Sequence, residues 1–125
     1  MKYIILILVM LASAATAHEM TPTYPKLIPS AYDGIYKTTM KMFNKRVDIQ
    51  YYEVGVFDKD FNTVPFVTSY SVLKIDYLSH VTFDIYIREN DVAKAVYVCS
   101  KSKIRIEDIR RTAISSRICS KFKND

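Results

Sequence analysis

Apolar and polar residues alternate along most of the chain after residue 17, with the period of two that is typical of β-strands. The stretch on which the prediction depends most runs from Phe66 to Arg88, and it alternates at the end of its first half and throughout its second half. Its second half places apolar side chains on one face, at Val81, Phe83, Ile85 and Ile87. We predict two long strands in this stretch, joined by a corner at residues 78–80. A strand pair with one apolar face has to bury that face against a second sheet.

The same alternation predicts shorter strands at residues 35–43, 49–57, 94–101 and 112–122. Turn signals separate them, including Asp33-Gly34 and the polar stretches at residues 58–65 and 89–92. Residues 18–29 are rich in proline and predict an irregular edge strand that pairs in pieces. Residues 104–111 fit either a loop or a short helix. About seven short strands with turns between them predict an all-β fold, a single β-sandwich.

The first 17 residues have the pattern of a cleavable secretory signal peptide. Lys2 precedes an apolar run from Ile4 to Leu11, and the small residues Ala15 and Ala17 frame a cleavage site. The run is shorter than the ~20 residues that span a bilayer, and no later stretch is apolar enough to span one. We therefore predict an exported protein, periplasmic or secreted, whose folded domain comprises residues 18–125.

The chain has two cysteines, Cys99 and Cys119, and both lie in the predicted domain. Cysteines in exported proteins usually form disulfide bonds. We predict a Cys99–Cys119 bond that joins the last two strands, with two free thiols as the alternative. Their spacing matches no zinc or redox motif.

The formal net charge is +5, and Lys and Arg are concentrated from Lys94 onward. A basic end of this kind suits anionic lipid, lipopolysaccharide, nucleic acid or an acidic protein partner. A solvated charged surface is the ordinary alternative on a small domain. The charge density is too low and too irregular to predict a specific nucleic-acid-binding site.

The two histidines, His18 and His80, give the sharpest chemical hypothesis. Cleavage after Ala17 leaves His18 as the first residue, so its α-amino group and ring could chelate copper. A second histidine would complete a three-nitrogen brace suited to Cu(II). His80 lies in the predicted corner at the same end of the sandwich, and Asp76 or Met20 is a candidate further ligand. The simpler alternative is that His80 only caps a turn.

Other motifs point away from catalysis. Ser79 and His80 are adjacent, but no glycine-framed nucleophile or third orienting group accompanies them. No glycine-rich phosphate loop is present. Met40 and Met42 share a strand face and could be soft copper ligands, but such methionines more often fill a core. We therefore predict that the protein is not an enzyme.

A proline-broken first strand is followed by KTTMKMFNKRVDIQYYEVGVFDKD and then by LKIDYLSHVTFDIYI. This order of elements resembles an immunoglobulin-like sandwich, and more closely the N-terminal domain of periplasmic pilus-assembly chaperones. In that family, basic residues on the first and last strands anchor the C-terminal carboxylate of a pilus subunit. The resemblance implies this role for Lys26 and for Arg117 or Lys121. The chain as a whole also resembles small exported uncharacterised proteins of marine bacteriophages.

These patterns favour an exported, non-enzymatic interaction module at the cell envelope or on a virion surface. We expect it to bind a protein partner through strand edges and loops, with no resident cofactor. The exposed edge beside the proline-rich N-terminal segment is the predicted docking edge. The alternative is a periplasmic copper-binding protein that uses His18 and His80.

Overall fold

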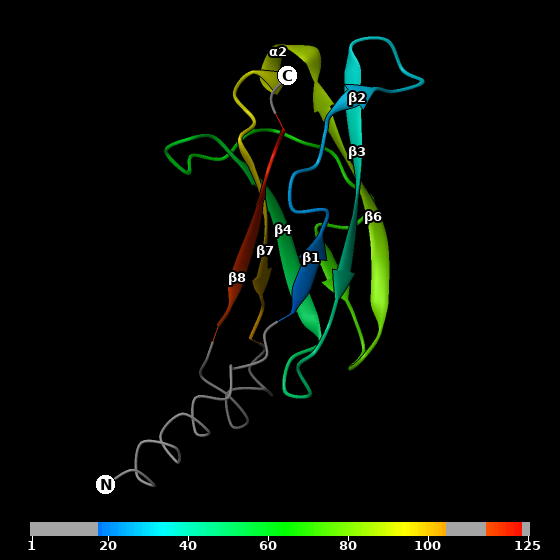
Figure 1. Cartoon of the computed structure of the whole chain (residues 1–125), viewed down its shortest axis with the longest axis vertical. Coiled ribbons are helices and arrows are strands. Elements are labelled where there is room, and N and C mark those ends of the chain that lie inside the picture. The colour runs from blue at the N-terminus through cyan, green and yellow to red at the C-terminus, as the bar shows by residue number, and fades with distance from the viewer. Residues whose placement is uncertain (1–17, 105–114, 124–125) are drawn as a thin grey trace, which may run out of the picture.

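The computed structural model describes residues 18–104 and 115–123, and it shows two antiparallel β-sheets packed face to face (Figure 1). The all-β sandwich predicted from the alternation is confirmed. The predicted signal peptide lies outside the described residues, as do residues 105–111 of the stretch that fits a loop or a helix. Among the described residues, no helix is long and apolar enough to cross a membrane.

The first sheet is built around β3 (Ile35–Phe43), which pairs with β6 (His80–Arg88) along its whole length. On its other side β3 pairs with two short pieces of the N-terminal segment, β1 (Glu19–Thr21) and β2 (Ile28–Pro29). The prediction that this segment pairs in pieces is confirmed. The segment cannot form one continuous strand, because each of its prolines lacks the N–H group that a continuous ladder of hydrogen bonds needs.

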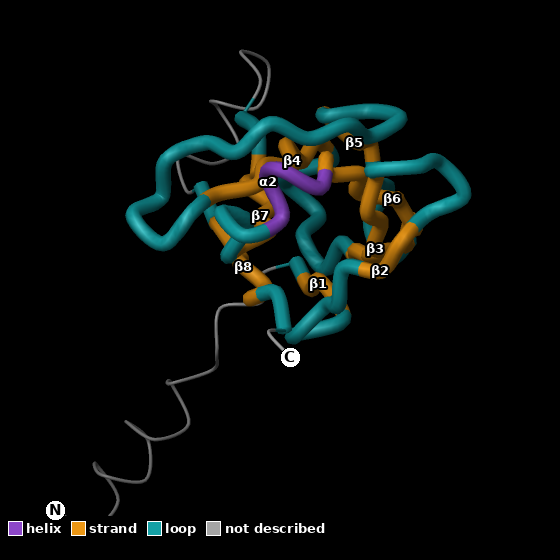
Figure 2. The backbone as a smooth tube through the Cα atoms, turned by 90° about the horizontal axis from the view of Figure 1, so that it is seen from above, coloured by secondary structure: helices purple, strands orange, loops and turns teal. Residues whose placement is uncertain are grey.

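The second sheet has the strand order β5 (Val72–Lys74), β4 (Tyr51–Phe57), β7 (Tyr97–Ser102) and β8 (Arg117–Lys121). Figure 2 shows how the two layers meet at their sides, with β5 beside β6 and β8 beside β1. The single-turn helix α2 (Glu89–Val92) connects β6 towards β7 at a position where the sequence predicted a turn.

The core lies between the sheets and follows the predicted alternation. On β3 and β6, the side chains of Met40, Met42, Ile85 and Ile87 are fully buried. They face the buried residues of the other sheet, Tyr52, Val54, Val56 and Val98. Each buried side chain of this size contributes roughly 1.5–3 kcal/mol through the hydrophobic effect. Met40 and Met42 therefore pack in the core.

The predicted strand pair between Phe66 and Arg88 is wrong in its first half. Only Val72–Lys74 forms a strand there, and it pairs with β4 in the second sheet. The chain crosses from one sheet to the other because Ile75 turns into the core and Leu78 adopts a positive φ of 60°. The backbone N–H of Leu78 donates to the carbonyl of Asn44, which fixes this crossing. His80 is the first residue of β6 rather than part of a corner.

The two cysteines lie directly opposite each other on β7 and β8. Their Sγ atoms are 2.04 Å apart, as in a disulfide bond, so the structure pairs the residues that the sequence paired. The bond joins the last two strands of the second sheet, as predicted.

Candidate functional site

His18 and His80 lie at the same end of the sandwich but on opposite faces of the first sheet. Glu19, next to His18, is level with Phe43 of β3, which in turn is level with His80. The His18 side chain points into the interior and is 1% exposed, whereas His80 is exposed on the outer face. Because neighbouring strands are about 4.8 Å apart, the two residues are also separated by about two strand spacings.

The His18 ring belongs to a polar network inside this end of the sandwich. Its Nε2 lies 2.7 Å from the hydroxyl of Ser100, and its Nδ1 lies 3.3 Å from the hydroxyl of Ser116. The ring also packs against Tyr52, with centroids 4.4 Å apart. The guanidinium of Arg46 donates to the Ser116 hydroxyl over 3.4 Å, so the network continues to the partly buried ion pair between Arg46 and Asp48.

Burial decides the protonation of this network. It lowers the pKa of His18 to about 4, and the positive charge of Arg46 acts in the same direction, against the hydrogen bond to Ser100. Burial also raises the pKa of Tyr52 to about 12. The imidazole is therefore neutral at pH 7 and accepts or donates single hydrogen bonds to serine hydroxyls.

We expect the free energy of unfolding to fall by about 2 kcal/mol between pH 7 and pH 5 through His18 alone. Its pKa is about 4 in the folded protein and 6.5 in the unfolded chain, so the unfolded chain takes up the proton first as the pH falls. This stability is fully present above pH 6.5 and is lost as the pH approaches 4. Urea unfolding at a series of pH values measures it.

The matched pair of variants is His18→Gln and His80→Gln. The first should flatten this part of the pH dependence, because it removes the buried ionisable ring. The second should leave the dependence in place, because His80 is exposed. An unchanged slope in His18→Gln would show that another group causes it.

The copper hypothesis stays a prediction, and the described residues do not fit a brace formed by His18 and His80 together. Asp76 is exposed beyond β5, while Met20 is buried on the same face as His18. Among the described residues, no three His, Cys, Asp or Glu side chains are grouped closely enough to hold a metal ion. Cu(II) titration of protein that begins at His18, read by electron paramagnetic resonance, tests the hypothesis. Loss of nitrogen ligands in His80→Ala would support the brace.

Of the three predicted anchor residues, two lie on β8 and the third, Lys26, lies in the N-terminal segment between β1 and β2. Lys121 and Arg117 are both exposed, at the two ends of the strand. Lys26 follows Pro25, whose carbonyl accepts a hydrogen bond from the N–H of Lys123 over 2.8 Å. The structure therefore brings Lys26 towards the Lys121 end of β8 and not towards Arg117.

The predicted docking edge beside the proline-rich N-terminal segment corresponds in the structure to the outer edge of β8, which is largely covered. The N–H of Lys121 donates to the carbonyl of Thr23 over 3.1 Å, and Lys123 bonds to Pro25 in the same way. At the other end of the strand, the His18 side chain contacts Ser116. Only the short stretch between these contacts keeps outward backbone groups without a partner among the described residues.

A longer free edge runs along β6, which pairs only with β3 and makes one isolated bridge on its outer side. In that bridge, Val67 and Tyr86 exchange two hydrogen bonds of 2.9 Å. Even-numbered residues of β6 therefore point their N–H and C=O groups outward. In the described part of the chain, nothing bonds to these groups at Thr82 and Asp84. The edge from His80 to Asp84 is thus open.

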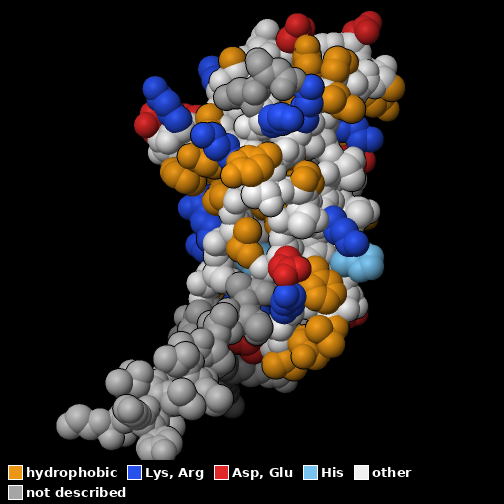
Figure 3. All heavy atoms as spheres, in the orientation of Figure 1, with side chains coloured by type: hydrophobic (Ala, Val, Ile, Leu, Met, Phe, Trp, Pro, Cys, Tyr) orange, Lys and Arg blue, Asp and Glu red, His pale blue; other side chains and the backbone are white. Residues whose placement is uncertain are grey.

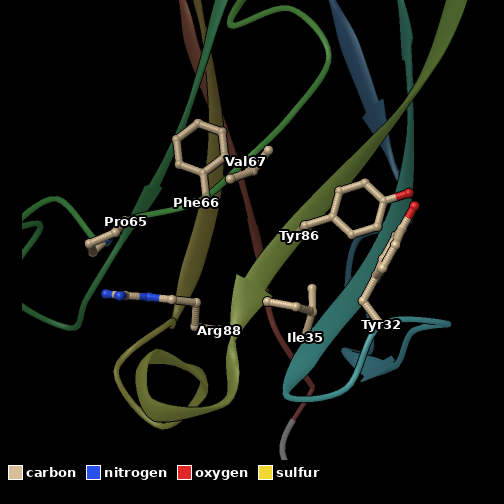
Figure 4. A pocket seen from close by; sticks show the side chains of 7 residues that line it. All are labelled: Tyr32, Ile35, Pro65, Phe66, Val67, Tyr86 and Arg88. Atoms are coloured by element: carbon tan, nitrogen blue, oxygen red, sulfur yellow. The ribbon is translucent and has the colours of Figure 1, made fainter.

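A mainly apolar groove of about 410 Å³ lies just beyond this open edge (Figure 4). Figure 4 shows Phe66 and Val67 on one side of the groove and Tyr86, Ile35 and Tyr32 on the other. The side chains of Val67 and Tyr32 are 67% and 69% exposed, which is unusual for large apolar residues. Arg88 lies at the rim and pairs with Asp91 over 3.0 Å.

The alternation of apolar and polar residues does not predict this groove. Phe66 and Val67 belong to a stretch predicted as a long strand, and no surface groove is expected there. A signal was present in Pro65, which does not fit a central strand, and in the adjacent turn at Ser69-Tyr70-Ser71. These breaks indicate a loop, and apolar residues in a surface loop are candidates for contact with a partner.

The geometry defines an immunoglobulin-like β-sandwich in which the edge of β6 is open and adjoins an apolar groove. Among solved structures, the Escherichia coli chaperone DraB is similar over 85% of this chain and 53% of that chain, with a TM-score of 0.64 and 15% identity. A Salmonella enterica structure of the SafA pilin in complex with the SafB chaperone is similar over 88% of this chain and 54% of that chain, with a TM-score of 0.62 and 12% identity.

The predicted resemblance to pilus chaperones therefore holds at the level of the fold. This chain spans about half the length of the chains that it matches. No family model matches the sequence. No curated protein matches it either, so the predicted resemblance to bacteriophage proteins stays a prediction.

Proposed function

We propose that the protein is an exported interaction module that binds an extended segment of a protein partner along the free edge of β6. The partner's backbone would continue the first sheet next to residues 80–84. One of its apolar side chains would enter the groove beside Tyr86. No step of this function is chemical, so the protein acts by binding alone.

The observation that carries the proposal is the open edge itself. Residues 80–84 present outward backbone groups with no partner among the described residues, and the groove begins two residues further along β6. Added strands gain affinity from main-chain hydrogen bonds and specificity from pockets for alternate side chains. The edge supplies unpaired main-chain groups, and the groove supplies a pocket for an apolar side chain.

Two further observations support it. The Salmonella structure holds a pilin together with a chaperone, so proteins similar in fold to this one can be found bound to another protein. The Cys99–Cys119 bond fits an oxidising compartment outside the cytoplasm, where exported proteins form disulfides.

The deciding variant is Thr82→Pro. Proline removes one outward N–H from the free edge, and the ladder to β3 uses the odd-numbered residues, so the sheet should remain intact. Peptides selected from a displayed random library against the wild-type protein should bind Thr82→Pro about tenfold more weakly or worse, since one hydrogen bond is lost and the ring blocks the edge. Fluorescence anisotropy measures the affinities.

Thr82→Ala is the matched control, because it changes the same side chain and keeps the N–H. It should bind the selected peptides as the wild type does. Circular dichroism should show that both variants are folded. If the selected peptides bind Thr82→Pro as tightly as the wild type, the free edge of β6 is not the binding site.

A further inference from the structure

On the outer face of the second sheet, the side chains form three rows that run across the strands. This face is away from the free edge of β6. Each row takes one residue from β4, one from β7 and one from β8. The rows are Glu53, Lys101 and Arg117; Gly55, Cys99 and Cys119; and Phe57, Tyr97 and Lys121. Figure 3 shows basic and apolar side chains next to one another along this side of the molecule, over β7 and β8. The disulfide bond lies in the middle row.

Lys101 and Arg117 are directly opposite each other on β7 and β8. The N–H groups of the odd-numbered residues on β8 face away from β7, as Lys121 shows. The pair is therefore of the non-hydrogen-bonded kind, in which opposite side chains approach most closely. Like charges in this position destabilise a sheet. No carboxylate of the described residues forms an ion pair with either residue, so neither positive charge is compensated within that part of the chain.

Arg117 is nevertheless held in place by aromatic rings. Its Cζ lies 4.6 Å from the ring centroid of Phe57 and 5.2 Å from that of Phe61. Tyr97 stacks on Phe61 with centroids 4.8 Å apart and an angle of 4°. Stacking on ring faces fixes the guanidinium plane and leaves its N–H groups free to donate.

Gly55 shapes the surface beside this arginine. A Cβ atom at Gly55 would come within 2.9 Å of the Phe57 ring. Only glycine lets that ring lie down over the strand, and the result is a hollow of about 260 Å³. Lys101, Arg117 and Glu53 all line the hollow. The Glu53 carboxylate lies 4.0 Å from the ammonium of Lys103, which is its ion-pair partner among the described residues.

We propose that this hollow binds a phosphate monoester between Lys101 and Arg117. A phosphate monoester carries about −1.5 to −2 charges at pH 7 and so balances two cations, whereas a carboxylate balances one. Its oxygens accept charge-assisted hydrogen bonds from a planar guanidinium. Single-stranded nucleic acid fits less well, because the ring faces on which bases would stack contact Tyr97, Phe61 and Arg117.

The test is a titration of ¹⁵N-labelled protein with glycerol 3-phosphate, followed by two-dimensional NMR at low ionic strength. We expect saturable shifts of the amides around Cys99, Lys101 and Arg117. Arg117→Gln and Lys101→Gln should each weaken binding about tenfold or more, since each removes a charged hydrogen-bond donor. Binding should also weaken as salt is added. Lys74→Gln, an exposed lysine in the same sheet, is the matched control and should bind as the wild type does.

Two further probes distinguish between a free phosphate group and the phosphate of a lipid headgroup as the natural ligand. Binding of inorganic phosphate at the same residues indicates recognition of the bare group. Binding to vesicles that contain phosphatidic acid, and not to pure phosphatidylcholine vesicles, extends the site to lipid headgroups. Absence of localised shifts with all of these probes would overturn the proposal, as would equal weakening in Lys74→Gln.

This site and the free edge of β6 lie on different sheets, so their tests are separable. Thr82→Pro should leave phosphate binding unchanged. Arg117→Gln should leave peptide binding unchanged.

Discussion

Replacing Asn44 by alanine is expected to lower the free energy of unfolding by about 4 kcal/mol. The side chain is fully buried. Its amide nitrogen donates to the backbone carbonyls of Ile49 and Ile75, each over 2.8 Å. Its Oδ1 accepts from the backbone N–H of Arg46 over 2.9 Å and from the hydroxyl of Tyr52 over 2.5 Å. Alanine would leave these buried groups without partners, at a cost of roughly 1–3 kcal/mol for each group that water cannot reach.

The effect should be large because Asn44 joins three separate parts of the chain. It follows β3, it fixes the loop that leads into β4, and it holds the crossing that leads into β6. Urea unfolding monitored by circular dichroism measures the loss. Asn90→Ala, an exposed asparagine in α2, is the control and should change stability by less than about 0.5 kcal/mol. A loss below about 1 kcal/mol for Asn44→Ala would mean that water replaces the missing amide.

Removing the Cys99–Cys119 bond is expected to cost roughly 3 kcal/mol. The bond closes a loop of 20 residues, and the loss of that constraint raises the entropy of the unfolded chain. The double variant Cys99→Ala, Cys119→Ala should therefore unfold at a lower urea concentration. Alanine is chosen in place of serine because the side chain of residue 99 is almost fully buried, and a serine hydroxyl there would have to be buried too.

Wild-type protein in a reducing agent is the control, and it should match the double variant. The double variant itself should not respond to the reducing agent. An unchanged unfolding midpoint after reduction would contradict the expected role of the bond in stability.

The sequence predicts the fold well where one strand face is apolar over many residues. The strand predicted at residues 35–43 is β3, and Tyr52, Val54 and Val56 point into the core as expected. The prediction failed where the chain passes from one sheet to the other. Between Phe66 and Lys74 only Val72–Lys74 forms a strand, and it pairs with β4 in the second sheet. Local pattern carries no information on which distant strand will be the partner.

The candidate sites show the same limit. The prediction that His18 and His80 lie at the same end of the sandwich is correct. Which face of the sheet each one occupies depends on whether it is in step with the buried or with the exposed residues of its strand. His18 has the same parity as the buried Met20, and His80 has that of the polar residues Thr82 and Asp84. The alternation therefore already contains their separation across the sheet. The free edge of β6 could not be predicted in this way. It depends on which strands pair with β6 in the folded protein, and the local pattern does not contain that information.

The open edge of β6 also affects how readily the protein aggregates at high concentration. Unpaired strand edges act as templates on which other chains add strands, including second copies of the same protein. Charged side chains on such a strand limit this growth, and β6 carries Asp84, held by Lys37 and Thr39, and Arg88. Solubility at high concentration therefore depends on a few charges that contribute little to the stability of the fold. Neutralising them would convert an available binding edge into a starting point for aggregation.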